Sequence, residues 1–279
     1  MDALIYELRA WDGLPLHVKE RRRGAGRLPL LCLPGIVRTS GAFRMVAEQL
    51  PGDWRMVALD YAGRGQSGRS RDIDRYAPTA CLRDVLDVCA ALHLRRVVAL
   101  GTSFGGLLAM GIAVARPGLL RAVVLNDVGP EIGQEGGAFI RQFVGHDPAL
   151  PSRAACVAHL RAVLPPLSLA SEEAWGLMAE LTYGPNSDGL WHPLWDTRIA
   201  RLLDAGPPEL WPLFRALGHL PLLLLRGELS TVLLPETVAR MQAERPDLQV
   251  ATVPGIGHGP TLTEPDVLRA LQAFLDRVA

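Results

Sequence analysis

Ser103 is the residue in this sequence best placed to act as a nucleophile. It stands at the centre of Gly101-Thr102-Ser103-Phe104-Gly105, which follows an apolar run and precedes a run of small residues. Between a buried strand and a helix, a Gly-x-Ser-x-Gly pattern predicts a sharp turn that lifts the serine Oγ clear of the backbone. The N-terminus of the new helix would favour negative charge developing there. The pattern therefore predicts attack of Ser103 on an acyl carbonyl, whereas a plain glycine–serine turn is the alternative for the bare motif.

A serine hydroxyl is a weak nucleophile, so a base must accept its proton. Of the seven histidines, only His258 lies in a glycine-rich loop that follows the last strand-like segment, in residues 253–260. Loops at the carboxyl ends of strands are where open α/β sheets place their sites. His258 is therefore the predicted general base, and the other histidines are assigned to packing or surface roles.

Acyl transfer also needs donors for the oxyanion, usually the amide after the nucleophile and one in the loop after the third strand. The Phe104 N–H satisfies the first requirement. The Ile36 N–H satisfies the second, because Pro34-Gly35 forms a turn at the end of an apolar run. We predict an oxyanion hole formed by Ile36 and Phe104.

Strands and helices alternate through most of the chain, which is typical of an α/β protein. The expected strands are residues 4–10, 16–20, 29–33, 54–60, 96–100, 122–126, 221–226 and 248–253. The expected helices begin near residues 40 and 79 and cover 107–115, 235–242 and 267–278.

The alternation stops between residues 128 and 216, where prolines break short helical patches. We predict an α/β core of residues 1–127 and 217–279, with residues 128–216 inserted as a helical cap. Four of the six tryptophans fall in the cap: Trp175, Trp191, Trp195 and Trp211. They could line an apolar pocket or pack a small core of the cap itself.

The amino-acid composition of the chain limits the kinds of molecule that it is expected to bind. Lys plus Arg equals Asp plus Glu, at 29 each, so no net field favours nucleic acid or an anionic membrane. The longest apolar stretch, residues 220–225, is far shorter than the roughly 20 residues of a membrane span. The start of the chain lacks the pattern of a secretory signal, so a cytoplasmic location is the default. Four scattered cysteines predict reduced thiols, and no spacing predicts a metal site. We expect a small-molecule substrate, no cofactor, and a monomer or homodimer.

Taken together, these features resemble the α/β-hydrolase superfamily. The resemblance rests on the order of elements, the Ser103 motif, Pro34-Gly35, the run Asp60-Tyr-Ala-Gly-Arg-Gly-Gln-Ser67 and the late Gly-His258. It implies a mostly parallel eight-stranded sheet with helices on both faces and an inserted helical cap. Within the superfamily the chain looks like cap-bearing carboxylesterases, enol-lactonases and carbon–carbon bond hydrolases. Haloalkane dehalogenases and epoxide hydrolases use an aspartate nucleophile, which Ser103 argues against.

Residues 63–68 also satisfy the Gly-x-Gly-x-x-Gly pattern of dinucleotide sites. The residues that follow do not form an apolar helix, so a phosphate would lack a helix N-terminus to bind. The resemblance implies a structural turn here instead.

The sequence departs from the family pattern at the acid that should orient His258. Relatives commonly carry an aspartate after the seventh strand, and this position is Thr231 here. Asp127 is the first candidate to replace it, because it ends the sixth strand, where some dehalogenase-like relatives carry their acid. Glu228 is the second candidate and Glu131 the third. Asp127 could alternatively bond backbone amides at the start of its loop.

The expected activity is that of a serine hydrolase that cleaves a small carboxylic ester or related acyl substrate through an acyl-enzyme. Lactone or carbon–carbon bond hydrolysis at the same site is an alternative. Thr231 suggests another alternative function, that of a catalytically weakened binding protein on the hydrolase scaffold, because loss of the acid can cost about 10⁴ in rate.

Overall fold

The computed structural model describes residues 3–22, 27–204, 209–218 and 220–278. Its main sheet has eight strands in the order β1-β2-β4-β3-β5-β6-β9-β10. β1 pairs antiparallel with β2, and β2 pairs antiparallel with β4, whereas the remaining neighbours are parallel. The strands are Leu4–Arg9 (β1), Pro15–Arg21 (β2), Leu30–Leu33 (β3), Met56–Leu59 (β4), Val97–Thr102 (β5), Leu120–Asn126 (β6), Leu222–Gly227 (β9) and Gln249–Val253 (β10). The predicted mostly parallel eight-stranded sheet is confirmed.

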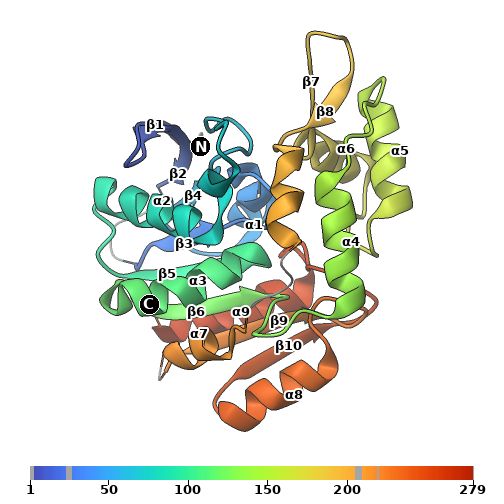
Figure 1. Ribbon diagram of the computed structural model, residues 1–279. Helices are drawn as coiled ribbons and strands as arrows, with labels where there is room; N and C mark the ends of the chain where they lie inside the picture. The colour runs from blue at the N-terminus through green and yellow to red at the C-terminus, as the bar shows by residue number, and fades with distance from the viewer. Residues whose placement is uncertain (1–2, 23–26, 205–208, 219, 279) are drawn as a thin grey trace.

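Helices cover both faces of this sheet (Figure 1). One face carries α2 (Pro78–Ala91), α3 (Phe104–Ala115), α7 (Trp211–Ala216) and α8 (Pro235–Glu244), and the other carries α1 (Arg44–Gln49) and α9 (Pro265–Val278). Successive residues of β5 alternate between the two cores: Val97 and Ala99 enter one, Val98 and Leu100 the other. A strand buried on both faces is continuously apolar, which is why the central strands could be predicted.

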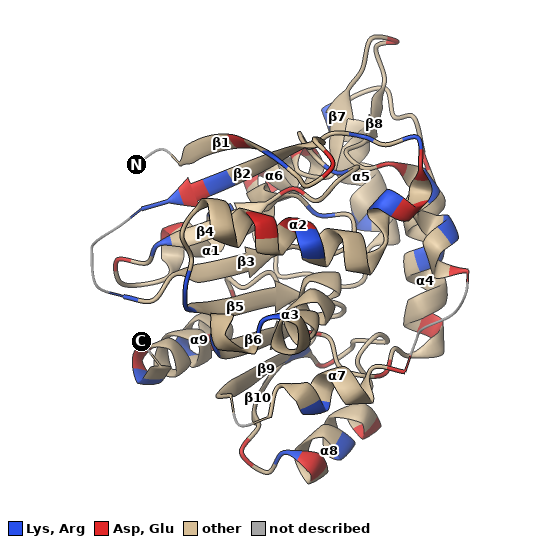
Figure 2. Ribbon diagram, turned by 60° about the vertical axis from the view of Figure 1, so that its left-hand side comes forward, with Lys and Arg blue, Asp and Glu red and all other residues tan. Residues whose placement is uncertain are grey.

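The connecting 3-10 helices are η1 (Ser40–Phe43), η2 (Ile73–Tyr76) and η3 (Pro117–Leu119). Along the ribbon, Lys and Arg residues are interspersed with Asp and Glu residues (Figure 2). Within the described parts of the chain, no helix combines the length and the apolar character that crossing a membrane requires.

The described part of the segment predicted as a cap, residues 128–216, contains α4 (Gln134–Gly145), α5 (Arg153–Val163), α6 (Glu172–Glu180), β7 (Tyr183–Pro185), β8 (Trp191–Pro193) and η4 (Thr197–Leu203). These elements share a third apolar cluster, in which Trp195 is buried and Trp175 and Trp191 are partly buried. Trp211 instead packs with α3 in the first core. All four tryptophans therefore pack in cores.

The hairpin of β7 and β8 was not expected in a helical cap. Asn186-Ser-Asp-Gly189 joins its strands, with Gly189 at a φ of 82° and the Asp188 carboxylate accepting from the Leu190 N–H. Asparagine, aspartate and glycine are the residues that such turns favour. The signal was present, but strands of three residues each are too short to show a periodicity.

The cap meets the main sheet at loops that follow strand ends. The Gly65 N–H, after β4, donates to the Leu194 carbonyl at 2.6 Å, and the Gly257 N–H, after β10, donates to the Pro166 carbonyl at 2.8 Å. Both loops lie at the carboxyl edge of the parallel strands. The cap therefore contacts the edge at which the predicted site residues lie.

Candidate active site

Ser103 occupies the single residue between β5 and α3. Its backbone has a φ of 49° and a ψ of −116°, in the region that residues other than glycine rarely adopt. A Cβ on Gly105 would lie 1.9 Å from the Leu33 carbonyl oxygen, and one on Gly101 would lie 2.5 Å from the Gly105 oxygen. The two glycines of the motif thus allow α3 to pack directly against β3 and β5, and this packing holds the strained serine turn.

The structure joins three predicted residues in one hydrogen-bonded chain. His258 Nε2 lies 3.0 Å from Ser103 Oγ, and His258 Nδ1 lies 2.8 Å from Asp127 Oδ2. The Asp127 side chain is fully buried, and that of His258 is 16% exposed. A carboxylate that accepts from Nδ1–H leaves Nε2 free to take the serine proton.

Asp127 is held in place at the end of β6. Its φ is 55°, its N–H donates to the Leu225 carbonyl, and its Oδ1 accepts from the Gly227 N–H at 3.2 Å. The sequence left two alternatives for the Asp127 carboxylate, a bond to a backbone amide and a bond to His258, and the structure has both.

The other acid candidates bond elsewhere. Glu228 Oε2 accepts from the Gly255 N–H at 2.8 Å. Glu131 accepts from Trp211 Nε1 and forms an ion pair with Arg240. The Thr231 carbonyl faces the start of the cap, where a Cβ on Gly133 would lie 2.2 Å from it. Among the predicted acids, the structure brings only Asp127 to His258.

The loop that contains Ile36 lies against Ser103. A Cβ built on Gly35 would be 3.9 Å from the Ser103 Cβ. Tyr61 Oη donates to the Pro34 carbonyl at 3.1 Å, and Arg64 Nε donates to the Ile36 carbonyl at 2.8 Å. Within the described residues, no protein hydrogen bond uses the Ile36 N–H or the Phe104 N–H. Both predicted donors thus remain available beside the serine.

Sequence reasoning did not single out Arg64, which bonds the Ile36 loop. Its side chain is 1% exposed and packs over the rings of Tyr61 and Phe104, with Cζ 5.6 Å from each centroid. The surrounding loop wraps around Asp60, whose carboxylate accepts from the Ser40 and Gln66 N–H groups. Residues 63–68 therefore form a structural turn, as predicted. The sequence did contain a signal for Arg64, because it lies within residues 60–67, one of the segments on which the family resemblance rests.

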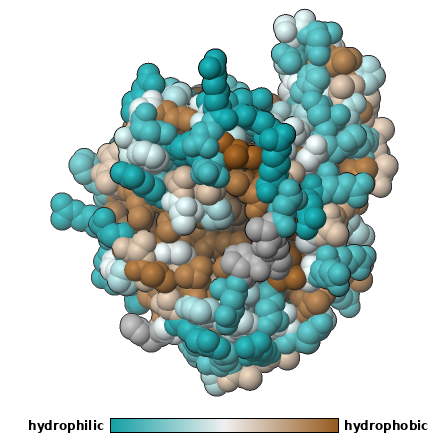
Figure 3. Space-filling view, in the orientation of Figure 1, coloured by the Kyte–Doolittle hydropathy of each residue, from teal (hydrophilic) through white to brown (hydrophobic). Residues whose placement is uncertain are grey.

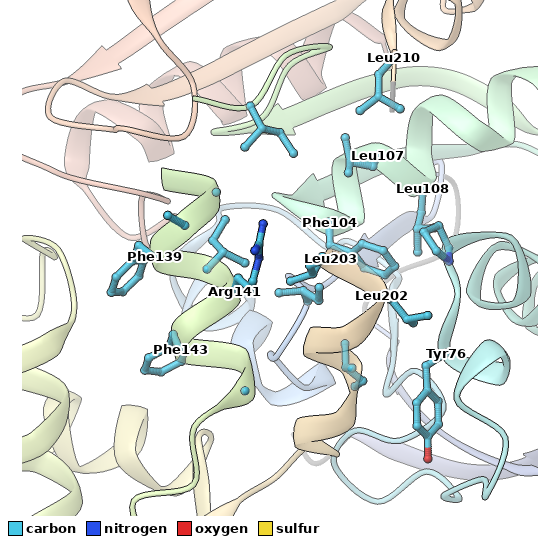
Figure 4. Close-up of a pocket in the computed structure, with 18 of the residues that line it drawn as sticks. Tyr76, Phe104, Leu107, Leu108, Phe139, Arg141, Phe143, Leu202, Leu203 and Leu210 are labelled. Atoms are coloured by element: carbon cyan, nitrogen blue, oxygen red, sulfur yellow. The ribbon is translucent and has the colours of Figure 1, made fainter. Parts of the chain in front are cut away.

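A cavity of about 1200 Å³ opens from Ile36 and Phe104 and runs between α3 and the cap. Figure 4 shows α3 on one side of it and α4 on the other, with Leu202 and Leu203 of η4 between them. Apolar side chains gather in this hollow (Figure 3). The described residues that line it do not include Trp175, Trp191, Trp195 or Trp211. The cavity reaches Ile36 and Phe104, the neighbours of the serine turn, and most of its lining is apolar.

Comparisons with known proteins agree with this architecture. The family model described as "Alpha/beta hydrolase family" matches residues 30–271. The 3-hydroxybutyrate-oligomer hydrolase of Cupriavidus necator is 32% identical over 247 residues, covering 85% of this chain and 84% of that protein. The 2-(acetamidomethylene)succinate hydrolase of Mesorhizobium japonicum is 27% identical, covering 94% and 92%.

A solved structure shows the same fold. The crystal structure of an alpha/beta hydrolase from Novosphingobium aromaticivorans superposes with a TM-score of 0.92 at 37% identity, and the match covers the whole of both chains. The family model spans most of this chain, including Ser103, Asp127 and His258. The chain belongs to the alpha/beta hydrolase family.

Proposed function

We propose that this protein is a serine hydrolase that cleaves small carboxylic esters through an acyl-enzyme. The observation that carries the proposal is the hydrogen-bonded chain from Ser103 through His258 to Asp127. It lies beside two amides, of Ile36 and Phe104, that have no described protein acceptor.

In the first half-reaction, Ser103 Oγ attacks the ester carbonyl carbon while His258 Nε2 takes the hydroxyl proton. The Ile36 and Phe104 N–H groups donate to the oxyanion of the tetrahedral intermediate. The intermediate then collapses, and the alcohol leaves with the proton from His258. Asp127 remains ionised and stabilises the imidazolium.

In the second half-reaction, His258 Nε2 takes a proton from water, whose oxygen attacks the acyl carbonyl. Collapse of the second intermediate returns the proton to Ser103 Oγ and releases the carboxylic acid. No other reactant is needed, so atoms and charge balance over the cycle.

One of the named relatives favours esters over the other acyl substrates. A hydroxy acid joined into oligomers forms ester bonds, and the Cupriavidus necator relative is named as a hydrolase of such oligomers. Thr231 alone favours a binding protein without turnover, and the contact between Asp127 and His258 removes that argument.

The test is ester hydrolysis by the purified protein and its Ser103→Ala variant. We expect the wild type to hydrolyse short-chain esters and the variant to lose about 10³-fold or more in kcat. A Ser103→Ala variant with the wild-type rate would overturn the proposal.

A further inference from the structure

Arg38 lies two residues after Ile36, on the loop that follows β3. A Cβ on Gly35 would lie 3.6 Å from Arg38 Cγ and 3.9 Å from Ser103 Cβ. The side chain reaches the cap, where Nη1 donates to Thr182 Oγ1 at 3.1 Å and contacts Met178 Sδ. The side chain of Arg38 therefore starts on the same loop as Gly35, which lies against Ser103, and ends at the end of α6.

The partners of Arg38 carry no charge. Thr182 Oγ1 donates its own proton to the Met178 carbonyl and so accepts from Arg38 with a lone pair. Within the described residues, no carboxylate forms an ion pair with Arg38. Burial lowers the pKa of Arg38 to about 10, so the guanidinium is still a cation at neutral pH. Burial also raises the pKa of the neighbouring Tyr183 phenol, which is therefore neutral.

The other buried arginines are compensated differently. Arg75 lies between the carboxylates of Asp12 and Asp84. Arg64 and Arg226 donate to main-chain carbonyls. A partly buried cation held only by a hydroxyl and a thioether is costly unless something else supplies the counter-charge.

One edge of the Arg38 guanidinium remains available. No described residue accepts from Nε or Nη2, and neither atom is among the buried polar atoms that lack a partner, so both reach open space. These two N–H groups form the edge of a guanidinium that binds a carboxylate in a bidentate manner.

We propose that Arg38 binds a carboxylate of the substrate, so that the protein acts on esters carrying a free carboxylate close to the scissile bond. This inference rests on the proposed function. It assigns the two walls of the site different tasks: Arg38 fixes the charged end, and the cavity along α3 takes an apolar group.

The kinetic test uses two esters of nearly the same shape. Monoethyl succinate carries a carboxylate where ethyl levulinate carries a neutral methyl ketone. We expect the wild type to have at least about a 10-fold higher kcat/KM for monoethyl succinate. In Arg38→Met the ratio of the two kcat/KM values should fall about 10- to 100-fold, and in Arg38→Lys by a smaller factor, because lysine keeps the charge but not the fork.

Arg44→Met is the matched control. Arg44 lies six residues further on, pairs with Glu48 and is 65% exposed, so the ratio should stay at the wild-type value. If Arg38→Met fails to fold, Arg38→Lys still tests the proposal. A wild type without preference between the two esters, or Arg38 variants within about twofold of the wild-type ratio, would overturn it.

A binding experiment separates this inference from the proposed function. In the Ser103→Ala background, monoethyl succinate should bind by calorimetry, and adding Arg38→Met should weaken binding about 10-fold or more. Equal binding with and without Arg38 contradicts the carboxylate site even if Ser103 proves essential. Conversely, hydrolysis that persists in Ser103→Ala would overturn the serine mechanism, whereas Arg38-dependent binding would still support the site.

Discussion

His258 Nδ1 lies 2.8 Å from Asp127 Oδ2, a contact between residues that are 131 positions apart in the chain. Asp127 follows β6, so the carboxylate reaches the imidazole from the strand next to that of Ser103. Thr231, after β9, stands where many relatives carry their acid. The contact predicts that Asp127 orients His258.

Asp127→Asn should lower kcat about 10³- to 10⁴-fold, because an amide can favour the wrong imidazole tautomer and cannot stabilise the imidazolium. Glu228→Gln is the matched control, since the Glu228 carboxylate accepts from the Gly255 amide, and its kcat should stay within about twofold of wild type. Steady-state kinetics on one ester measures both. The reverse pattern would make Glu228 the orienting acid.

Gly105→Ala should destabilise the fold. The added methyl would lie 1.9 Å from the Leu33 carbonyl oxygen, which belongs to rigid backbone. We expect a loss of about 3 kcal/mol or more in the free energy of unfolding, at or above the upper end of overpacking costs. Gly118→Ala is the control, because nothing lies within 4 Å of a Cβ there. Equal thermal midpoints for the two variants would contradict the packing described at the serine turn.

Arg64→Met should impair the rate by releasing the Ile36 loop. Without the bond from Nε to the Ile36 carbonyl, the Ile36 amide would lose its alignment, and loss of one oxyanion donor costs about 10²- to 10³-fold in kcat. We expect a fall of about 10- to 100-fold in kcat with little change in KM, and exposed Arg69→Met as a control should have neither effect. An Arg64 effect confined to KM would place this residue in substrate binding instead.

His192 should make the cap hairpin sensitive to pH. Its Nδ1 lies 2.7 Å from Asp147 Oδ2 and its Nε2 lies 2.9 Å from Asp188 Oδ2, and these bonds, Asp147 first, raise the pKa of His192. A raised folded-state pKa means that the stabilisation is fully present below the unfolded pKa and is lost as pH rises through the folded pKa. The thermal midpoint of wild type should therefore exceed that of His192→Gln more at about pH 5.5 than at about pH 9. A difference in thermal midpoint that is constant with pH would show that protonation of His192 is not linked to folding.

Local patterns in the sequence were enough to predict the strands of the main sheet and to propose the nucleophile. The motif that predicts the serine turn lies within residues 101–105. The buried face of α9, with Val267, Leu271 and Phe274, repeats with the period of a helix. Three features of the site could be proposed in this way because each is local in sequence: Ser103, the Phe104 amide and the His258 loop.

Contacts between distant segments could not be predicted with the same certainty. Asp127, Glu228 and Glu131 are equivalent as carboxylates, and only the packing of β6 against β9 decides which one faces His258. The four tryptophans between residues 128 and 216 are a second example, because a tryptophan suits a pocket lining and a packed core equally well. Arg38 gave no signal at all in the sequence, because its lack of a carboxylate partner is a property of its surroundings.

Covalent labelling of Ser103 tests the central claim most directly. A fluorophosphonate reacts only with a serine whose proton an adjacent base can accept, so the wild type should be labelled stoichiometrically, with the added mass on the peptide that contains Ser103. Ser103→Ala should remain unlabelled, and Asp127→Asn should react much more slowly. A wild-type protein that is not labelled, or that is labelled on another residue, would contradict the assignment of Ser103 as an activated nucleophile.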